Sequence, residues 1–138
     1  MARTFNLEIV TPDKYFYSGD VEMVVVRTLD GDKAFMANHM WTVAPIATGK
    51  LKIRTEDGTK TAACSGGFIH IKEDKTTIVT DSAEWPEDID KKRAEEAKKR
   101  AEEKLAAITA DIDVERAKIA IYKAINRIHI SEEHINIK

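Results

Sequence analysis

The chain changes character around Trp85 and Pro86, and this change constrains the fold more than any other feature of the sequence. Before it, apolar and polar residues alternate in short runs separated by turn-forming residues, which is typical of β-strands. After it, almost every residue favours a helix. The sequence therefore predicts an α+β protein with a β-domain over residues 1–86 and a helical domain over residues 87–138.

The alternation predicts a sandwich or small barrel of about ten short strands in the N-terminal part. The β-branched residues at 21–26 give the strongest strand signal. Leu51 and Ile53 alternate with basic residues, so one face of their strand is buried and the other is wet. Asp-Gly pairs at 30–31 and 57–58 predict tight turns between strands.

Two glycine-containing segments and the single cysteine give more specific expectations. Residues 18–20, Ser-Gly-Asp, predict a turn. Gly66 and Gly67 interrupt a strand run and indicate either a bulge or a close backbone approach that bends the sheet. Cys64 is the single cysteine and cannot form an internal disulfide, so a reducing, cytosolic setting and a small core residue are expected.

The C-terminal part predicts an antiparallel two-helix hairpin over residues 89–138, because apolar residues recur at spacings of three and four. Residues 111–113 supply N-cap acceptors for the second helix, and residues 131–133 suggest a short extra turn. An alanine-rich seam buries little apolar area, so we expect that the hairpin can detach and rearrange. The seam positions are Ala94, Ala97, Ala101, Leu105 and Ile108, then Val114, Ala117, Ile121, Ala124 and Ile128.

Composition excludes several classes of protein. With 22 Lys+Arg against 24 Asp+Glu, the formal net charge is -2, and nucleic acid is not an expected partner. No apolar run reaches the ~20 residues that span a bilayer, and no signal peptide is evident. The four histidines lack zinc-site spacing, and no phosphate-binding loop or nucleophile elbow occurs. The sequence therefore predicts neither a metal site nor a catalytic site.

Asp90 and Arg93 lie one turn apart where the first helix begins. A helix start alone accounts for both residues, with Asp90 capping the first turn and Arg93 as one of many solvated charges. The alternative is that the planar guanidinium of Arg93 holds phosphate groups. The residues by themselves favour the simple helix start.

Three motifs in a fixed order connect the chain to a known family: the strand at 21–26, Ser-Gly-Gly-Phe at 65–68, and Ile-Asp-x-x-Arg-Ala at 89–94, followed by the alanine-seamed hairpin. In this order and spacing the chain resembles the epsilon subunit of bacterial F-type ATP synthases. Residues 7–12 also look like the first strand and turn of that family. The resemblance covers nearly the whole chain.

The resemblance implies a non-catalytic rotor subunit, peripheral to the cytoplasmic face of the bacterial cell membrane. Such a subunit helps to couple ion flow across the membrane to ATP synthesis. The β-domain would bind the gamma subunit and rest on the ring of c subunits. The hairpin would either fold down or extend along gamma into the alpha/beta catalytic head, where the extended form inhibits ATP hydrolysis. No cofactor is required, and ATP would be a regulatory ligand that favours the folded form.

Carried over residue by residue, the resemblance also assigns candidate sites. Lys123 stands where an ATP-binding member has arginine, so a bidentate contact is lost there. The candidate ATP-site residues are Glu84, Ile89, Asp90, Arg93, Ala94, Arg100, Lys123 and Arg127. The candidate contacts to gamma and the c ring are Asp32, Met36, His39, Met40 and Trp41.

One loop departs from the pattern of the family, and one helix face carries many charges. Around His39 the family's Pro-Gly pair is replaced by Ala37 and Asn38, and a later proline by Trp41, so the contact details differ. The basic residues of the first helix alternate with acidic ones, as on an ordinary solvated face. The resemblance implies that this face also docks on acidic residues of the catalytic subunits.

Two other functions remain open at this point. The first is a structural clamp between gamma and the c ring, whose hairpin aids assembly without switching. The second is a stand-alone nucleotide-binding protein or enzyme. Co-purification with gamma from native membranes separates the second from a rotor subunit.

Overall fold

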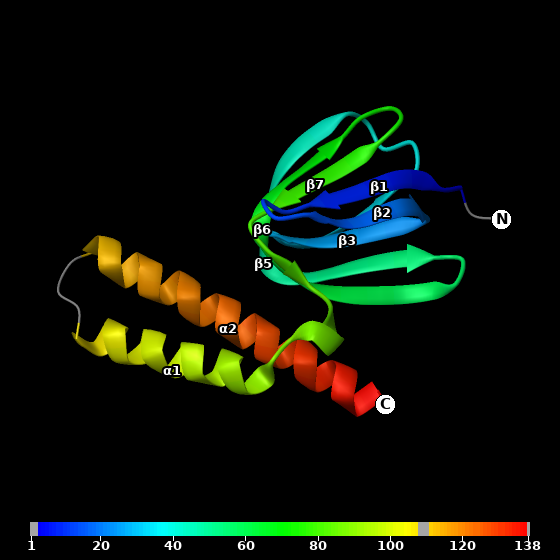
Figure 1. The fold of residues 1–138 in the computed structure, drawn as a ribbon. Coiled ribbons are helices and arrows are strands. Elements are labelled where there is room, and N and C mark those ends of the chain that lie inside the picture. Colours follow the sequence, from blue (N-terminus) through cyan, green and yellow to red (C-terminus); the bar gives the residue numbers. More distant parts are fainter. Residues whose placement is uncertain (1–2, 108–110, 138) are drawn as a thin grey trace. The chain divides into compact units, whose positions relative to one another are not determined.

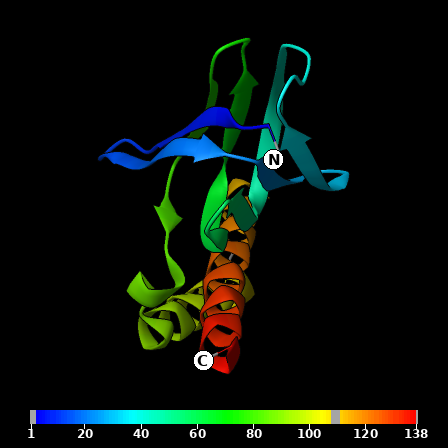
Figure 2. The ribbon, with the colours of Figure 1, turned by 90° about the vertical axis from the view of Figure 1, so that its right-hand side faces the viewer.

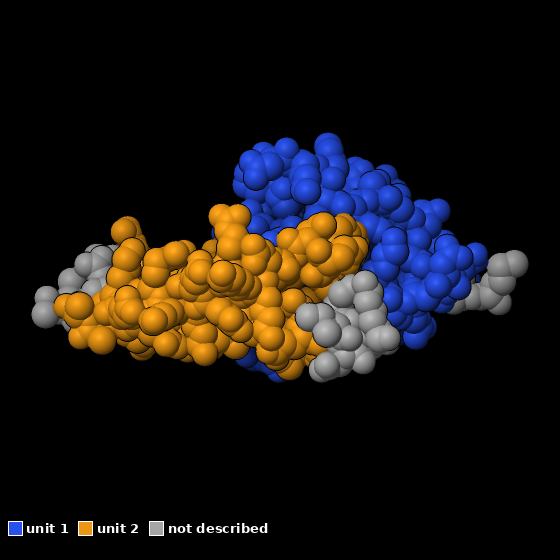
Figure 3. All heavy atoms as spheres, turned by 60° about the horizontal axis from the view of Figure 1, so that its bottom comes forward, with its two compact units in different colours: residues 1–84 blue, residues 85–138 orange. Residues whose placement is uncertain are grey.

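The computed structural model describes residues 3–107 and 111–137. The chain divides into two compact units, residues 1–84 and residues 85–138, which are drawn as ribbons in Figure 1 and in different colours in Figure 3. The first unit consists of strands and turns, and the second consists of helices. The α+β class and the order of the two parts predicted from the sequence are confirmed.

Unit 1 is built from one continuous sheet with the strand order β2-β1-β7-β6-β5-β3-β4, and β8 pairs with β6. The pairing of β1 with β7 is parallel, and the other pairs are antiparallel. The described strands are β1 (Phe5–Val10), β2 (Tyr15–Val21), β3 (Met23–Thr28), β4 (Gly31–Met36), β5 (Thr42–Thr55), β6 (Gly58–Ile71), β7 (Thr76–Thr80) and β8 (Ala83–Glu84).

The two long strands, β5 and β6, carry the sheet from one layer into the other (Figure 2). The first part of β5 pairs with the second part of β6, which continues to β7 and β1. The second part of β5 pairs with β3, which continues to β4. Large apolar side chains from both layers, among them Leu7, Ile9, Leu51, Ile53 and Ile78, are fully buried between them. Burying each of them stabilises the fold by about 1.5–3 kcal/mol.

The glycine pair at the bend brings two strands into close approach. The register between β5 and β6 is the same on either side of the pair, so the approach does not need an extra residue. A Cβ atom on Gly67 would lie only 1.9 Å from the carbonyl oxygen of Val79 in β7. Of the two expectations for this pair, the structure supports the close backbone approach and not the bulge.

The turn predicted at residues 18–20 is wrong. These residues lie inside β2, where Ser18, Gly19 and Asp20 pair with residues of β1. The chain instead leaves the strand at Glu22, between β2 and β3. Cross-strand pairing outweighs the local turn preference of the three residues, because strand propensity depends strongly on context.

Cys64 is buried in β6, as the sequence predicted for a small core residue. Its thiol donates a hydrogen bond to the Thr80 hydroxyl oxygen at 3.2 Å. Burial raises the pKa of the Cys64 thiol, which keeps it in the neutral form. A buried neutral thiol is a poor nucleophile, so Cys64 has a packing role.

Unit 2 contains a short 3-10 helix, η1 (Pro86–Asp88), and two α-helices, α1 (Lys91–Ala107) and α2 (Asp111–Ile137). The helices pack along the predicted seam, in which Ala94, Ala101, Ala117 and Ala124 are buried. Ile108 and the side chains of residues 111–113 lie outside the described part of the chain. The extra turn predicted after residue 130 is wrong, because α2 continues through buried Ser131.

Candidate functional site

The start of α1 is fixed by Asp90. Its carboxylate accepts a hydrogen bond from the backbone N–H of Arg93 at 3.1 Å, and its backbone carbonyl accepts one from Ala94 at 3.0 Å. This is the N-cap geometry that satisfies otherwise unpaired donors of the first turn, a contribution of about 1 kcal/mol. The simple interpretation of Asp90 as a helix start is therefore correct.

The Ile-Asp-x-x-Arg-Ala motif divides into two buried and two exposed residues. Ile89 precedes the cap in an extended conformation and is buried, and Ala94 is fully buried. The side chains of Asp90 and Arg93 are exposed. The apolar members hold the first turn of α1 in place, which leaves the Arg93 guanidinium available to an anion in solvent.

An ion pair brings the beginning of α1 and the later part of α2 to the same end of the hairpin. The Lys91 ammonium lies 3.0 Å from a carboxylate oxygen of Glu132. The hydrogen bond to Glu132 raises the pKa of Lys91. Since the helices are antiparallel, Arg127 lies about 7.5 Å along α2 from Glu132, toward the middle of the hairpin.

Lys123 and Arg127 are four residues apart on α2 and therefore share one helix face. Both are half-buried, and the Nε atom of Arg127 is fully buried. Measured along the helices from the Lys91–Glu132 ion pair, Arg127 lies about 5 Å beyond the level of Arg93, whereas Lys123, like Arg100, lies about 13.5 Å from the pair. This arrangement suits the phosphate groups of a nucleotide, because guanidinium groups bind phosphate in a bidentate manner.

The remaining two candidate ATP-site residues are Arg100 and Glu84. Arg100 is seven residues beyond Arg93, which is about 10 Å along α1. Glu84 closes β8 in unit 1, whereas the other seven candidates belong to unit 2. The structure therefore places Ile89, Asp90, Arg93 and Ala94 at the end of the hairpin where α1 begins, with Arg127 nearest to their level on α2, and it places Arg100 and Lys123 about 10 Å further along.

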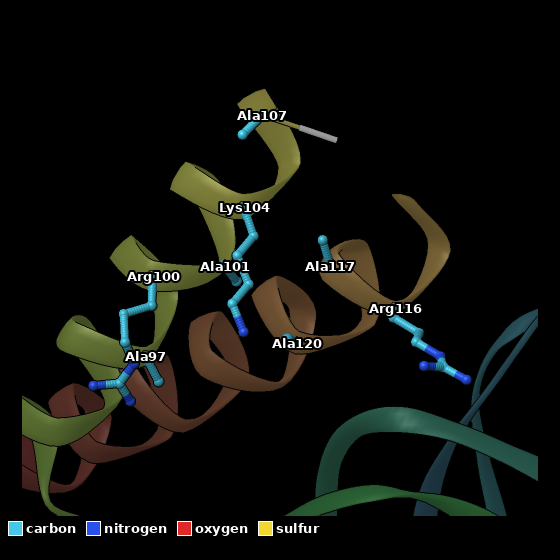
Figure 4. Close-up of a pocket in the computed structure, with 8 residues that line it drawn as sticks. All are labelled: Ala97, Arg100, Ala101, Lys104, Ala107, Arg116, Ala117 and Ala120. Carbon is cyan, nitrogen blue, oxygen red and sulfur yellow. The ribbon is translucent and has the colours of Figure 1, made fainter. Parts of the chain in front are cut away.

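A groove between α1 and α2 contains residues that the sequence did not single out as a group. Its volume is about 630 Å³. Arg100 lines it, together with Lys104 from α1 and Arg116 from α2 (Figure 4). The signal in the sequence was the repeated spacing of three and four residues in Ala97, Arg100, Ala101 and Lys104, which places them on one face of the helix.

The candidate partner residues of unit 1 fall into two places. Met36 ends β4, and His39, Met40 and Trp41 form the connection to β5. Asp32 lies near the other end of β4, about 13 Å from Met36, where it is paired with Arg27 across the β3-β4 hairpin. The structure therefore brings together four of these five residues and places Asp32 apart from them.

The connection after β4 is apolar and exposed. Met40 and Trp41 expose 77% and 72% of their surface, respectively, and Met36 is also exposed. The His39 ring packs edge-on against Phe35 at 4.9 Å between ring centroids, and Nδ1 of His39 lies 2.9 Å from the Met40 carbonyl oxygen. Exposed apolar groups gathered in one segment are typical of an interaction surface.

Comparisons with known proteins match both units. Residues 4–86 match the family described as ATP synthase, Delta/Epsilon chain, beta-sandwich domain. Residues 87–132 match its counterpart, the long alpha-helix domain. Together the fold and the two matches define a delta/epsilon chain of an ATP synthase.

Similar curated proteins show which member of the delta/epsilon class this chain matches. The ATP synthase epsilon chain of Alkaliphilus metalliredigens is 51% identical over 132 residues, which cover 96% of this chain and 98% of that protein. The epsilon chain of Caldicellulosiruptor bescii is 43% identical over 130 residues, covering 94% and 95%. The chain therefore belongs to the ATP synthase epsilon chain family.

Solved structures share the fold. A chain of the Euglena gracilis mitochondrial ATP synthase, OSCP/F1/c-ring, has a TM-score of 0.75 at 24% identity, covering 96% of this chain and 81% of that chain. A chain of the Tetrahymena thermophila mitochondrial ATP synthase central stalk and c-ring has a TM-score of 0.71 at 14% identity, with coverages of 94% and 98%.

Among the residues that the structure describes, no helix is both long enough and apolar enough to cross a membrane. No group of three or more His, Cys, Asp or Glu side chains among them is arranged to hold a metal ion.

Proposed function

We propose that this chain is a non-catalytic subunit of the central stalk of an F-type ATP synthase. In this role it helps to couple ion flow across the membrane to ATP synthesis, and it regulates ATP hydrolysis by switching its C-terminal hairpin between two positions. The observation that carries the proposal is the family match over both units, at up to 51% identity over almost the full length.

The exposed segment after β4 supports contact with the other rotor parts. Met36, Met40 and Trp41 expose large apolar side chains that a partner would cover. In this proposal the segment meets gamma and the c ring. The chain is then held at the cytoplasmic face of the bacterial cell membrane through the complex. Asp32, at the other end of β4, meets polar groups of the ring.

Three features of unit 2 support switching. The seam between α1 and α2 consists largely of alanine, so separating the helices exposes little apolar surface. On α2, the large side chains of Ile119, Tyr122 and Ile125 are 50%, 61% and 44% exposed, which suits a second docking place. The basic residues of α1 suit the acidic surface of an alpha/beta head.

ATP would act in this switch as a ligand with unequal affinity for the two positions. A ligand shifts a conformational equilibrium only by its difference in affinity for the two states. The candidate cations come from both helices, Arg93 and Arg100 from α1 and Lys123 and Arg127 from α2, so one ligand can meet both sets only while the hairpin is folded. Bound ATP therefore favours the folded hairpin.

Replacing Arg93 with alanine is expected to abolish measurable ATP binding by the isolated chain, because the guanidinium is the exposed phosphate-binding group of the motif. Isothermal titration with ATP measures this. Lys92→Ala is the matched control, since it removes one exposed charge from the neighbouring position. Equal affinity in the Arg93→Ala variant and the natural chain contradicts the ATP site.

Membership in the rotor is tested by purification from native membranes through a tag on this chain. The expected result is a complex that contains gamma and the catalytic subunits. A stand-alone nucleotide-binding protein or enzyme would instead be recovered without them, and the proposal would then fail.

A further inference from the structure

The end of the hairpin where α1 begins, here called the base, is closed by large side chains and an ion pair. Two isoleucines are buried there, Ile89 with 8% and Ile130 with 1% of its surface exposed. The Lys91 ammonium lies 3.0 Å from a carboxylate oxygen of Glu132, two residues beyond Ile130. The short helix η1, which ends three residues before Lys91, packs against α2 (Figure 1). The base therefore joins three segments: η1, the start of α1 and the later part of α2.

The other part of the hairpin, here called the groove half, surrounds a hollow. It comprises residues 97–107 of α1 and 116–120 of α2, which line the groove of about 630 Å³. Five of the lining residues are alanines, and atoms that line a hollow lose dispersion contacts. Arg100 and Lys104 lie four residues apart on α1, and Lys104 projects into the space between the helices (Figure 4). Like charges at this spacing destabilise a helix.

The two parts of the hairpin therefore differ in how strongly packing holds them. An isoleucine buries more apolar surface than an alanine, so each isoleucine of the base stabilises the folded hairpin more than each alanine of the groove half. Local opening of a protein begins where few apolar contacts are buried. We therefore expect the groove half to open at a lower free energy than the base.

We propose that the base is a latch, in which Ile89, Ile130, the Lys91–Glu132 ion pair and η1 hold the folded hairpin, and that the hairpin opens from the groove half first. Opening of the groove half alone leaves the base closed, whereas full separation of α1 and α2 requires the base to open. The strength of the base then sets the fraction of chains with an open hairpin. Its consequence for ATP hydrolysis rests on the proposed function, in which the extended form inhibits.

Amide hydrogen exchange of the full chain without ATP, resolved by residue with NMR, tests the order of opening. We expect the amides of residues 96–98 and 126–132 to exchange at least about tenfold more slowly than those of 102–106 and 116–120. Ile130→Val is expected to speed exchange in the base about two- to tenfold, the effect of removing one buried methylene group. It leaves the groove half unchanged, because that half opens without the base. Equal rates in both halves of the natural chain, or equal acceleration in the variant, overturn the proposal.

Charge reversal tests the ion pair. Lys91→Glu places two carboxylates together and is expected to speed exchange in the base about two- to fivefold relative to Lys92→Glu. Lys92→Glu is the matched control, since it makes the same charge change at the neighbouring exposed position. The double variant Lys91→Glu/Glu132→Lys restores a pair of opposite charges and is expected to return the rates to those of the control. Equal rates in the two single variants, or no recovery in the double variant, contradict the ion pair as part of the latch.

ATP hydrolysis by the assembled complex separates the latch from the switch. Lys91→Glu weakens the latch, so hydrolysis is expected to fall, and the double variant is expected to restore it. Faster exchange in the base together with normal hydrolysis would support the latch and contradict the switching in the proposed function.

Discussion

Replacing Gly67 with alanine is expected to lower the free energy of unfolding of unit 1 by about 3–5 kcal/mol, the upper end of single-substitution effects. Gly67 has φ +142°, a backbone conformation that residues with a side chain rarely adopt. Its Cβ would also lie 1.9 Å from the Val79 carbonyl oxygen and 2.9 Å from the Thr80 Cα. Both atoms belong to the backbone of β7, so they cannot move away as a flexible side chain could.

The neighbouring strands prevent the backbone at Gly67 from moving away from this contact. Gly67 pairs with Ile46 of β5 on one side and with Thr80 of β7 on the other, so a shift of its backbone disrupts two strand pairings. Gly58→Ala is the matched control, because Gly58 has φ +129° but nothing lies within 4 Å of the added Cβ. The control is expected to lose about 1 kcal/mol. Urea unfolding followed by circular dichroism measures both variants, and equal losses contradict this account.

Replacing Ala124 with leucine is expected to destabilise the folded hairpin by about 1–3 kcal/mol, because a packed site has no room for the added methylene groups. Ala124 is only 3% exposed and lies in the seam between α1 and α2. A loss of 1.4 kcal/mol shifts the folded hairpin tenfold toward the open form. In the proposed switch, the assembled complex then hydrolyses ATP more slowly, because the extended form is the inhibitory one.

Hydrogen exchange of the α1 and α2 amides measures the first part of this prediction, and steady-state ATP hydrolysis measures the second. Ala106→Leu is the control, since Ala106 is on the exposed side of α1 and accepts a larger side chain. Unchanged protection in Ala124→Leu shows that the seam is not tightly packed. Faster exchange without any change in hydrolysis separates hairpin opening from inhibition.

Much of the fold could be predicted because the patterns are local. The alternation around Leu51 and Ile53 gave the buried face of β5, and the Asp-Gly pairs marked the two turns that join β3 to β4 and β5 to β6. Ala94, Ala101 and Ala117 identified the seam of the hairpin. Each of these signals depends on residues that are close to one another in the sequence.

The predictions that failed depend on distant partners. Residues 18–20 look like a turn, yet β1 holds them in a strand. Residues 131–133 look like a fresh helix start, yet Ile130 and Ser131 are buried and α2 does not break there. No local pattern indicates which segment will pack against such residues.

The features of the candidate sites also divide into those with a local sequence signal and those that depend on residues far apart in the chain. The cap formed by Asp90 could be expected from its place before a helix. The ion pair between Lys91 and Glu132 could not, because it joins residues 41 positions apart in the chain. The charges of the groove were visible in the sequence, but their meeting around a hollow depends on how the two helices pack.

The central claim is that the hairpin restrains ATP hydrolysis. The most direct test measures ATP hydrolysis by the assembled complex containing either the full chain or a chain that ends at Asp88, with incorporation of both checked by electrophoresis. We expect a clear rise in hydrolysis when the hairpin is absent. Equal rates in the two complexes would contradict it and leave a structural clamp as the role of this chain.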